Sequence, residues 1–300
     1  MIRTELAHRK KKAWNLFFLT LPLMLFVVLF SYVPLAGWGL SFMEYHPGTP
    51  IFKNQLVGLK NFELIVKSRD MGRVIKNTVI LSGLNFILMV CPVVFALLLN
   101  EIGSSKFRRL AQTITTLPHF ISWVIVFSLS FAIFGSEGVV NQLFAPLGLQ
   151  QAVLINPRAV YWFQSLLSQW KNVGWSAIIY IAAITGIDQE LYEAATVDGA
   201  GRLRCVWHIT LPCLTPTILV LALLNIAGFI NTGTDQHFVF RNAIIMDNIE
   251  TLDLYTYRLG MQLFDYSYAT AVGIFKSFIS ITLLFITNNM AKRIRGESII

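Results

Sequence analysis

Apolar residues fall in long blocks along this chain. Charged residues are absent from 13–43, 77–100, 110–136, 172–187 and 205–234, and the run 266–291 is interrupted only by Lys276. A helix crosses a bilayer with about 20 apolar residues, whereas a membrane β-barrel shows alternating segments of about 10 residues. The pattern therefore predicts an all-α integral membrane protein with six transmembrane helices, near 14–40, 77–100, 110–134, 161–187, 211–231 and 267–290.

The polar stretches between these spans predict the remaining organisation. We expect a basic tail at 1–13, an external loop with a short helix at 41–76, a five-helix core at 77–290 and a second tail at 291–300. Within the core, 138–157 contains prolines, glycines and amides and is interpreted as an external loop. The first apolar run is longer than the 7–15 residues of a signal sequence, so we expect it to be retained.

Composition agrees with a membrane location. The chain is 55% hydrophobic and 13% charged, whereas soluble domains carry about 25% charged residues. This excludes a soluble enzyme, a disordered chain and a disulfide scaffold. Thirteen basic residues lie in segments that would be cytoplasmic with the N-terminus inside, against nine outside, which predicts that both termini are cytoplasmic. The net charge is +8. The basic residues flank the spans and do not form a stripe, so no nucleic-acid partner is expected.

Motifs of metal, redox or nucleotide chemistry are missing from the sequence. Its three cysteines and five histidines are scattered, and neither HExxH nor CxxC occurs. There is also no GxxxxGK[ST] loop for binding ATP. We therefore expect no catalytic residue, no metal site and no cofactor bound by this chain.

The longest predicted cytoplasmic loop, 188–212, is the most specific feature. Residues 189–197 predict a short helix, with Asp188 as its N-cap and Gly199 in the turn that ends it. Small residues beside larger apolar ones suit insertion into a groove of another protein. The alternative is an amphipathic helix that lies on lipid headgroups.

This loop resembles the EAA loop of binding-protein-dependent ABC importer permeases. The matching positions are Glu193, Ala194, Ala195, Gly199, Ile209, Leu211 and Pro212, with Asp198 beside them. The resemblance implies a coupling helix that docks on a cytoplasmic ATPase subunit, with Glu193 paired to a basic partner and the two alanines permitting close approach. Pro212 and Pro216 would fix where the fifth span begins.

Two further segments extend the resemblance to the polysaccharide and oligosaccharide permeases of the maltose-type superfamily. They are 58–78, which ends in Asn-Thr, and 252–277. The resemblance implies the type I ABC importer permease fold and a bacterial cell membrane. It also implies four kinds of partner: a second, non-identical permease, two ATPase subunits that carry ATP and Mg²⁺, an extracytoplasmic solute-binding protein and an oligosaccharide. Residues 233–237 depart from a phenylalanine-rich stretch common in such permeases, so another polar solute remains an alternative.

Transport of a hydrophilic solute requires polar groups inside the bundle. The candidates for the substrate pathway are Asn85, Trp123, Asn172, Trp175, Tyr180, Asn225 and Asn231. Amides can bond sugar hydroxyls, and aromatic rings can stack on sugar rings. The alternative for each amide is a helix–helix hydrogen bond worth about 0.6–2 kcal/mol.

Lys276 is the eighth candidate, since it lies about ten residues into the last span. A charge at the bilayer centre costs at least about 2.5–3.5 kcal/mol, so such residues face a cavity or a partner. We expect Lys276 to bond backbone carbonyls or to meet an acidic or hydroxyl-rich solute. The alternative is a lysine that snorkels to the interface.

Two other functional classes stay open at this point. A stand-alone secondary transporter would usually show inverted repeats and intramembrane acids, and a membrane anchor or sensor would need no docking loop. Co-purification with an ATPase separates the ABC permease from both.

Overall fold

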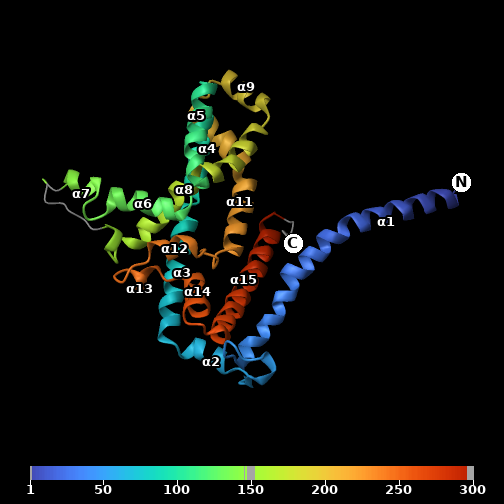
Figure 1. The fold of residues 1–300 in the computed structure, drawn as a ribbon. Coiled ribbons are helices and arrows are strands. Elements are labelled where there is room, and N and C mark those ends of the chain that lie inside the picture. The colour runs from blue at the N-terminus through green and yellow to red at the C-terminus, as the bar shows by residue number, and fades with distance from the viewer. Residues whose placement is uncertain (1, 145, 147–152, 296–300) are drawn as a thin grey trace. The chain divides into compact units, whose positions relative to one another are not determined.

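The computed structural model describes residues 2–144, 146 and 153–295, which are mostly helical (Figure 1). The chain divides into two compact units, which are described separately. Unit 1 consists of Met1–Lys67 and Leu259–Ile274, and unit 2 consists of Ser68–Arg258 and Phe275–Ile300.

Unit 1 begins with one long apolar helical run. Helix α1 (Ile2–Val27) continues into a π-helical turn, η1 (Val28–Tyr32), and a 3-10 helix, η2 (Val33–Phe42). Pro34, at the start of η2, has no N–H to donate to the preceding turn. From Leu16 to Phe42 the run is long and apolar enough to cross a membrane, and its most apolar window has no buried residue. These side chains are therefore available to contact lipid or another chain.

The rest of unit 1 follows this run. Its elements are β1 (Met43–Glu44), η3 (Ile51–Lys53), β2 (Gln55–Leu56), α2 (Lys60–Lys67), part of the π-helical turn η8 (Arg258–Gln262) and the first turns of α15 (Tyr266–Arg295). The strands are antiparallel, with Met43 opposite Leu56. Buried Asn61 of α2 donates to the carbonyls of Ser41 and Met43, at 2.9 and 3.2 Å. Helix α2 lies in 41–76, where a short helix was expected, and the two short strands pair beside it in a chain that is otherwise mostly helical.

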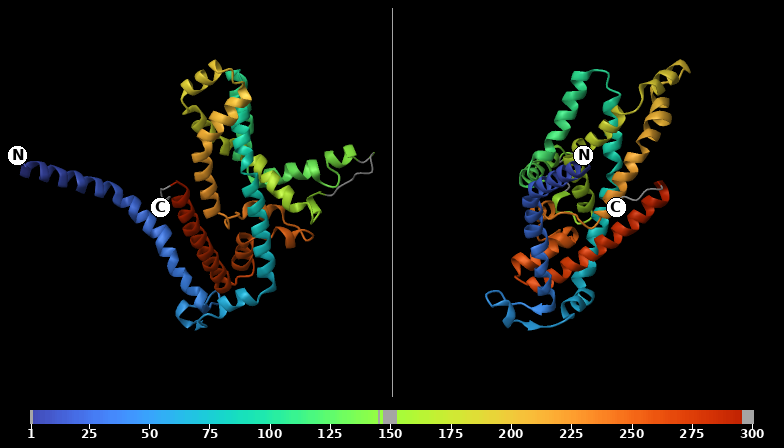
Figure 2. Two further views of the ribbon diagram at one scale, coloured as in Figure 1. Left: turned by 180° about the vertical axis from the view of Figure 1, so that it is seen from behind. Right: turned by 90° about the vertical axis from the view of Figure 1, so that its right-hand side faces the viewer.

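Unit 2 is a helical bundle. Its long helices are α3 (Arg69–Leu88), α4 (Val90–Asn100), α5 (Ser105–Thr116), α6 (Trp123–Phe134), α8 (Val160–Thr185), α11 (Leu211–Ala227) and the later part of α15. Shorter elements connect them: η4 (Leu117–Phe120), α7 (Val139–Phe144), η6 (Val153–Ile155), α9 (Gln189–Val197), α10 (Arg202–Cys205), η7 (Val206–Thr210), α12 (Asp235–Phe240), α13 (Met246–Ile249) and α14 (Leu252–Tyr257). Helix α8 packs against α3, α4, α5 and α11, so it is the central element of the unit (Figure 2).

The core of unit 2 forms where α8 meets α4 and α11. Buried Ala177, Tyr180 and Ile184 pack against Val93, Ala96 and Leu214. Van der Waals packing of this kind, with small residues at the contact, is what associates helices inside a membrane. At Gly174 helix α8 lies close against α5, because a Cβ built there would lie 2.3 Å from the Thr115 carbonyl oxygen of α5.

Five helical runs in the described part of the chain are long and apolar enough to cross a membrane. They are Leu16–Phe42, Arg69–Asn100, Trp123–Phe144, Arg202–Ala227 and Tyr266–Arg293. The predicted span 161–187 coincides with α8, which is 26 residues long but is not among these five, so the number six stays a prediction.

The prediction of a continuous span over 110–134 is wrong. The chain bends at η4, which carries Pro118, and helix α6 starts anew after Ser122, whose hydroxyl accepts the N–H of Ile125 at 3.4 Å. Lys171 of α8 stabilises the bend, since its Nζ donates to the carbonyls of Pro118 and His119 at 3.1 and 2.5 Å. A tertiary contact thus satisfies backbone carbonyls that a continuous helix would have bonded itself.

Candidate functional site

A cavity of about 440 Å³ opens between α3, α8, α11 and the turn that follows α11. Six of the eight pathway residues predicted from the sequence line it: Asn85, Asn172, Trp175, Tyr180, Asn225 and Asn231. The other two, Trp123 and Lys276, are not among its lining residues. Helices far apart in the sequence therefore bring most of the predicted polar and aromatic groups to one space.

Five further polar side chains line this cavity without having been predicted. They are Ser82, Ser168, Gln169, Ser176 and Thr232. A usable signal was present, because the cavity residues of α8 recur at helical spacing from Ser168 to Ile179 and so form a stripe on one face. The predicted candidates were amides and aromatic residues taken one at a time, so Gln169 and the hydroxyls along that stripe were missed.

The polar atoms in the cavity are only partly satisfied by the protein. Asn225 donates to the Leu221 carbonyl at 2.9 Å, but the Ser82 hydroxyl and the Gln169 amide nitrogen are buried with no hydrogen-bond partner among the described residues. A buried polar atom without a partner costs about 1–3 kcal/mol. Such atoms favour occupation of the cavity by water or by a solute rich in hydroxyl groups.

One wall of the cavity is attached to the bend at η4. Asn172 Oδ1 lies 2.9 Å from His119 Nδ1, and the His119 ring stacks on Trp175 with centroids 4.6 Å apart. Trp123, at the start of α6, lies beneath the Lys171 ammonium, 5.5 Å from its ring centroid. Trp123 therefore belongs to the support of this wall and not to its lining.

Lys276 forms an ion pair with Asp253 of α14. The second oxygen of Asp253 accepts the N–H of Gly233 at 2.9 Å and faces the Thr232 hydroxyl at 3.4 Å. The partner of Lys276 is therefore a carboxylate of the same chain, which the sequence reasoning did not identify. Nearby, burial lowers the pKa of His237 to about 4 despite an opposing effect of the Asp253 charge.

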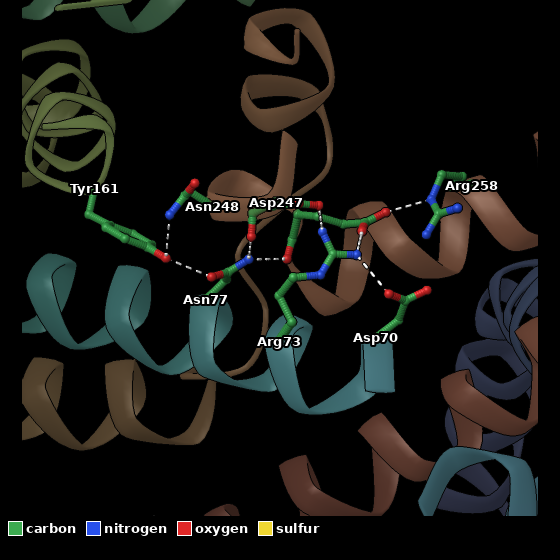
Figure 3. A network of polar contacts seen from close by, with 8 residues as sticks. Asp70, Arg73, Asn77, Tyr161, Asp247, Asn248 and Arg258 are labelled. Atoms are coloured by element: carbon green, nitrogen blue, oxygen red, sulfur yellow. Dashed lines mark hydrogen bonds and ion pairs between the residues drawn. The ribbon is translucent and has the colours of Figure 1, made fainter. Parts of the chain in front are cut away.

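A second network links the start of α3 to α13 and α14 (Figure 3). Buried Glu250 lies between Arg73 and Arg258, at 2.9 and 2.5 Å. Arg73 also pairs with Asp70 and Asp247. This network was not predicted, because Arg73 and Arg258 were counted only as basic residues of external loops.

Asn77 extends the Glu250 network toward α8. Its amide donates to the carbonyls of Asp247 and Glu250 at 2.8 and 3.1 Å and accepts the Tyr161 hydroxyl at 2.7 Å. The following residue, Thr78, accepts the N–H of Leu252 at 2.9 Å. The Asn-Thr pair noted in the sequence thus fastens α3 to two other parts of unit 2.

The predicted docking helix is present as α9, and its bounds, Gln189–Val197, are those predicted. The Asp188 carboxylate accepts the N–H of Glu190 at 3.0 Å, which confirms the N-cap. At the other end Gly199 has φ +74°, and Ala200 N donates to Ala195 O at 2.9 Å. This is a Schellman stop, in which glycine adopts the left-handed conformation without strain.

The rest of the predicted loop continues as helix. Glu193, Ala194 and Asp198 are exposed, and Ala195 is half-buried. Ile209 lies in η7, and Leu211 and Pro212 begin α11. One helical run extends from Arg202 to Ala227, so Pro212 lies within a helix, and the expectation that Pro212 and Pro216 fix the start of the fifth span stays a prediction. The π-helical turn η7 just before the proline accommodates its missing N–H.

Helix α9 is fastened to η7 through Tyr192. The Tyr192 hydroxyl lies 2.9 Å from the Thr210 hydroxyl of η7, and Thr210 is buried. In both figures α9 lies at the same end of unit 2 as the turn between α4 and α5 (Figures 1 and 2). Unit 2 therefore presents a short, capped helix at one of its ends.

Comparison with known proteins identifies relatives over nearly the whole chain. Residues 88–296 match the family described as binding-protein-dependent transport system inner membrane component. Protein LplB of Bacillus subtilis is 37% identical over 299 residues, which cover 98% of this chain and 93% of the relative. The polygalacturonan/rhamnogalacturonan transport system permease protein YteP of the same organism is 39% identical and covers 95% and 89%.

Solved structures show the same fold. One is the crystal structure of a bacterial ABC transporter involved in the import of the acidic polysaccharide alginate, with a TM-score of 0.88, 33% identity and coverage of 97% of this chain and 99% of that one. The same TM-score and identity relate this chain to the alginate transporter in complex with an alginate pentasaccharide-bound periplasmic protein.

Proposed function

The chain belongs to the binding-protein-dependent transport system inner membrane component family, and on that premise we propose that the cavity is its saccharide passage and that α9 couples it to ATP hydrolysis. It is a multi-pass membrane permease subunit of a sugar ABC importer, and the family is not one of enzymes. The family therefore excludes the two alternatives, a stand-alone secondary transporter and a membrane anchor or sensor.

The observation that carries the proposal is the convergence of amides, hydroxyls and aromatic rings on one cavity of about 440 Å³. Amide and hydroxyl groups bond sugar hydroxyls, and the exposed face of Trp175 offers a flat surface for a pyranose ring. The unpartnered Ser82 and Gln169 atoms gain partners when a saccharide enters. An oligosaccharide is therefore the occupant that best fits the lining.

The ATPase contact is assigned to α9. Its solvent face carries Glu193 and Ala194, and Val197 at its end is 88% exposed. Small residues allow another helix or groove to approach closely, and Glu193 offers a charge for a basic partner. The N-cap at Asp188 and the stop at Gly199 keep α9 short. A short helix can transmit movement without bending.

The complete importer requires further subunits. We infer a second, non-identical permease, two ATPase subunits that bind ATP with Mg²⁺, and an extracytoplasmic solute-binding protein. One solved relative supports the binding protein of this set, because it is in complex with an alginate pentasaccharide-bound periplasmic protein. By the same inference the chain lies in a bacterial cell membrane, with both termini and α9 on the cytoplasmic side.

Two tryptophans on α8 provide a matched test of the passage. Trp175 lines the cavity and is 46% exposed, whereas Trp170 is 41% exposed and lines a separate apolar groove. In vesicles containing the assembled importer, ATP-driven uptake of oligogalacturonides, arabino-oligosaccharides and diacetylchitobiose is measured for each alanine variant. Trp175→Ala should lower uptake about tenfold, as expected for loss of an aromatic contact worth about 1.5 kcal/mol. Equal uptake by both variants would contradict the assignment.

A further inference from the structure

Asp253 is held from two sides by groups that come from different parts of unit 2. Lys276, from within α15, pairs with its Oδ1 atom. Its Oδ2 atom accepts the backbone N–H of Gly233 at 2.9 Å and lies 3.4 Å from the Thr232 hydroxyl. The carboxylate therefore connects α15 to the turn after α11.

That turn is a wall of the cavity. Helix α11 ends at Ala227, Asn231 N donates to the Gly228 carbonyl at 2.8 Å, and Gly233 has φ +75°. Asn231 and Thr232 both line the cavity. The contact between Asp253 and Gly233 therefore fixes one edge of the space in which a saccharide would lie.

The charges explain why the two residues occur together. The side chains of Lys276 and Asp253 are only 20% and 15% exposed, and Lys276 lies in a helix that is apolar enough to span a membrane. A single charge there would be costly, whereas a close pair of opposite charges is neutral as a unit. His237 is the nearby titratable group that responds to Asp253, and its low pKa keeps it uncharged near neutral pH.

We propose that Lys276 and Asp253 are positioning residues that hold the turn 231–233 as a wall of the cavity, so that the transport rate depends on their pairing. The idea rests on the proposed passage. Lys276 acts through Asp253 and the turn, and it does not contact the solute. This differs from a general structural role, because removal of the pair should change the turn while the rest of the fold stays as it is.

Hydrogen–deuterium exchange on the assembled importer reads the turn without any saccharide. Lys276→Met removes the cation that positions the Asp253 carboxylate, so the hydrogen bond from the Gly233 N–H to that carboxylate should weaken. Exchange of the Gly233 amide should then rise on the order of tenfold, as expected for weakening one charged hydrogen bond. The α9 segment, which shares no contact with the pair, serves as the internal control. Lys276→Met with Asp253→Asn should restore slow exchange, because an uncharged carboxamide oxygen still accepts the Gly233 N–H.

Uptake of the same three saccharides provides the second readout. Lys276→Met should lose most of the uptake, Lys276→Arg should retain it, and the neutral double variant should recover it. Unchanged Gly233 exchange in Lys276→Met, or a double variant no better than the single one, would overturn the proposal. If exchange responds as expected while Trp175→Ala transports normally, the positioning of the turn stands and the proposed passage is wrong.

Discussion

Replacing Gly174 with alanine should separate α8 from α5. The added Cβ would lie 2.3 Å from the Thr115 carbonyl oxygen and 2.7 Å from the Thr116 nitrogen, whereas an ordinary contact is 3.4–4 Å. Both obstacles are backbone atoms, so no side chain can rotate away, and the helices must move apart by about 1 Å. Overpacking of this kind costs about 1–3 kcal/mol. It opposes the gain of up to about 1 kcal/mol that alanine brings to a helix.

The matched control is Gly83→Ala in α3, where an added Cβ meets nothing within 4 Å. Thermal unfolding of the purified protein in detergent, followed by a thiol-reactive dye that detects exposed cysteines, compares the two variants. For a unit of about 200 residues, each kcal/mol shifts Tm by about 2–4 °C. Gly174→Ala should lower Tm, and Gly83→Ala should leave it unchanged or raise it. Equal Tm values for Gly174→Ala and the unmodified protein would refute the close approach of α8 and α5.

Three more predictions follow from the contacts. Glu250→Gln removes the buried carboxylate between two arginines and should lower the free energy of unfolding by about 3 kcal/mol, whereas Glu63→Gln, at an exposed pair, should change Tm little; equal shifts would contradict the network. Burial lowers the pKa of His237 to about 4, so between pH 6.5 and about 4 the unfolded chain binds more protons than the folded one, and the free energy of unfolding should fall by up to about 3 kcal/mol as the pH drops over that range. His237→Leu should make Tm nearly independent of pH there, and an unchanged slope of Tm against pH would assign the pH dependence to another group. Glu193→Lys combined with Gly199→Pro should abolish saccharide-stimulated ATP hydrolysis by the importer, and full stimulation would count against coupling through α9.

Local structure was predictable wherever neighbouring residues determine it. The bounds of α9 follow from a capping aspartate and a stop glycine, and both interactions are formed. The last span, predicted at 267–290, lies within α15 (Tyr266–Arg295). These elements depend on hydrogen bonds between residues at most five apart, so their signals are contained in short stretches of sequence.

Features that depend on distant partners were not predictable. The bend at η4 is stabilised by Lys171, more than fifty residues away in the sequence, and an apolar run with a single proline resembles a continuous span. Glu250 meets Arg73 across 177 positions. The Asp253 partner of Lys276 is likewise set by how α14 packs near α15, which the pattern of apolar residues does not specify.

For the cavity, the residue types were predictable but their directions were not. Polar residues in apolar helices are few, so the choice of Asn85, Asn172 and Asn225 required only the composition of the spans. Which of them face one space depends on the rotation of α3, α8 and α11 about their axes. Trp123 shows the limit, because a helix that starts anew after η4 directs it to Lys171.

The central claim is that a saccharide occupies the cavity during transport, and protection of a cysteine tests it most directly. With Cys91, Cys205 and Cys213 replaced by serine, Asn85→Cys places one thiol in the cavity lining and Trp170→Cys places one in the apolar groove. A small maleimide is applied to the importer during ATP-driven uptake, with and without the transported saccharide. We expect the saccharide to slow labelling at position 85 and to leave position 170 unaffected. Equal labelling of position 85 in both conditions would contradict occupation of the cavity by the saccharide.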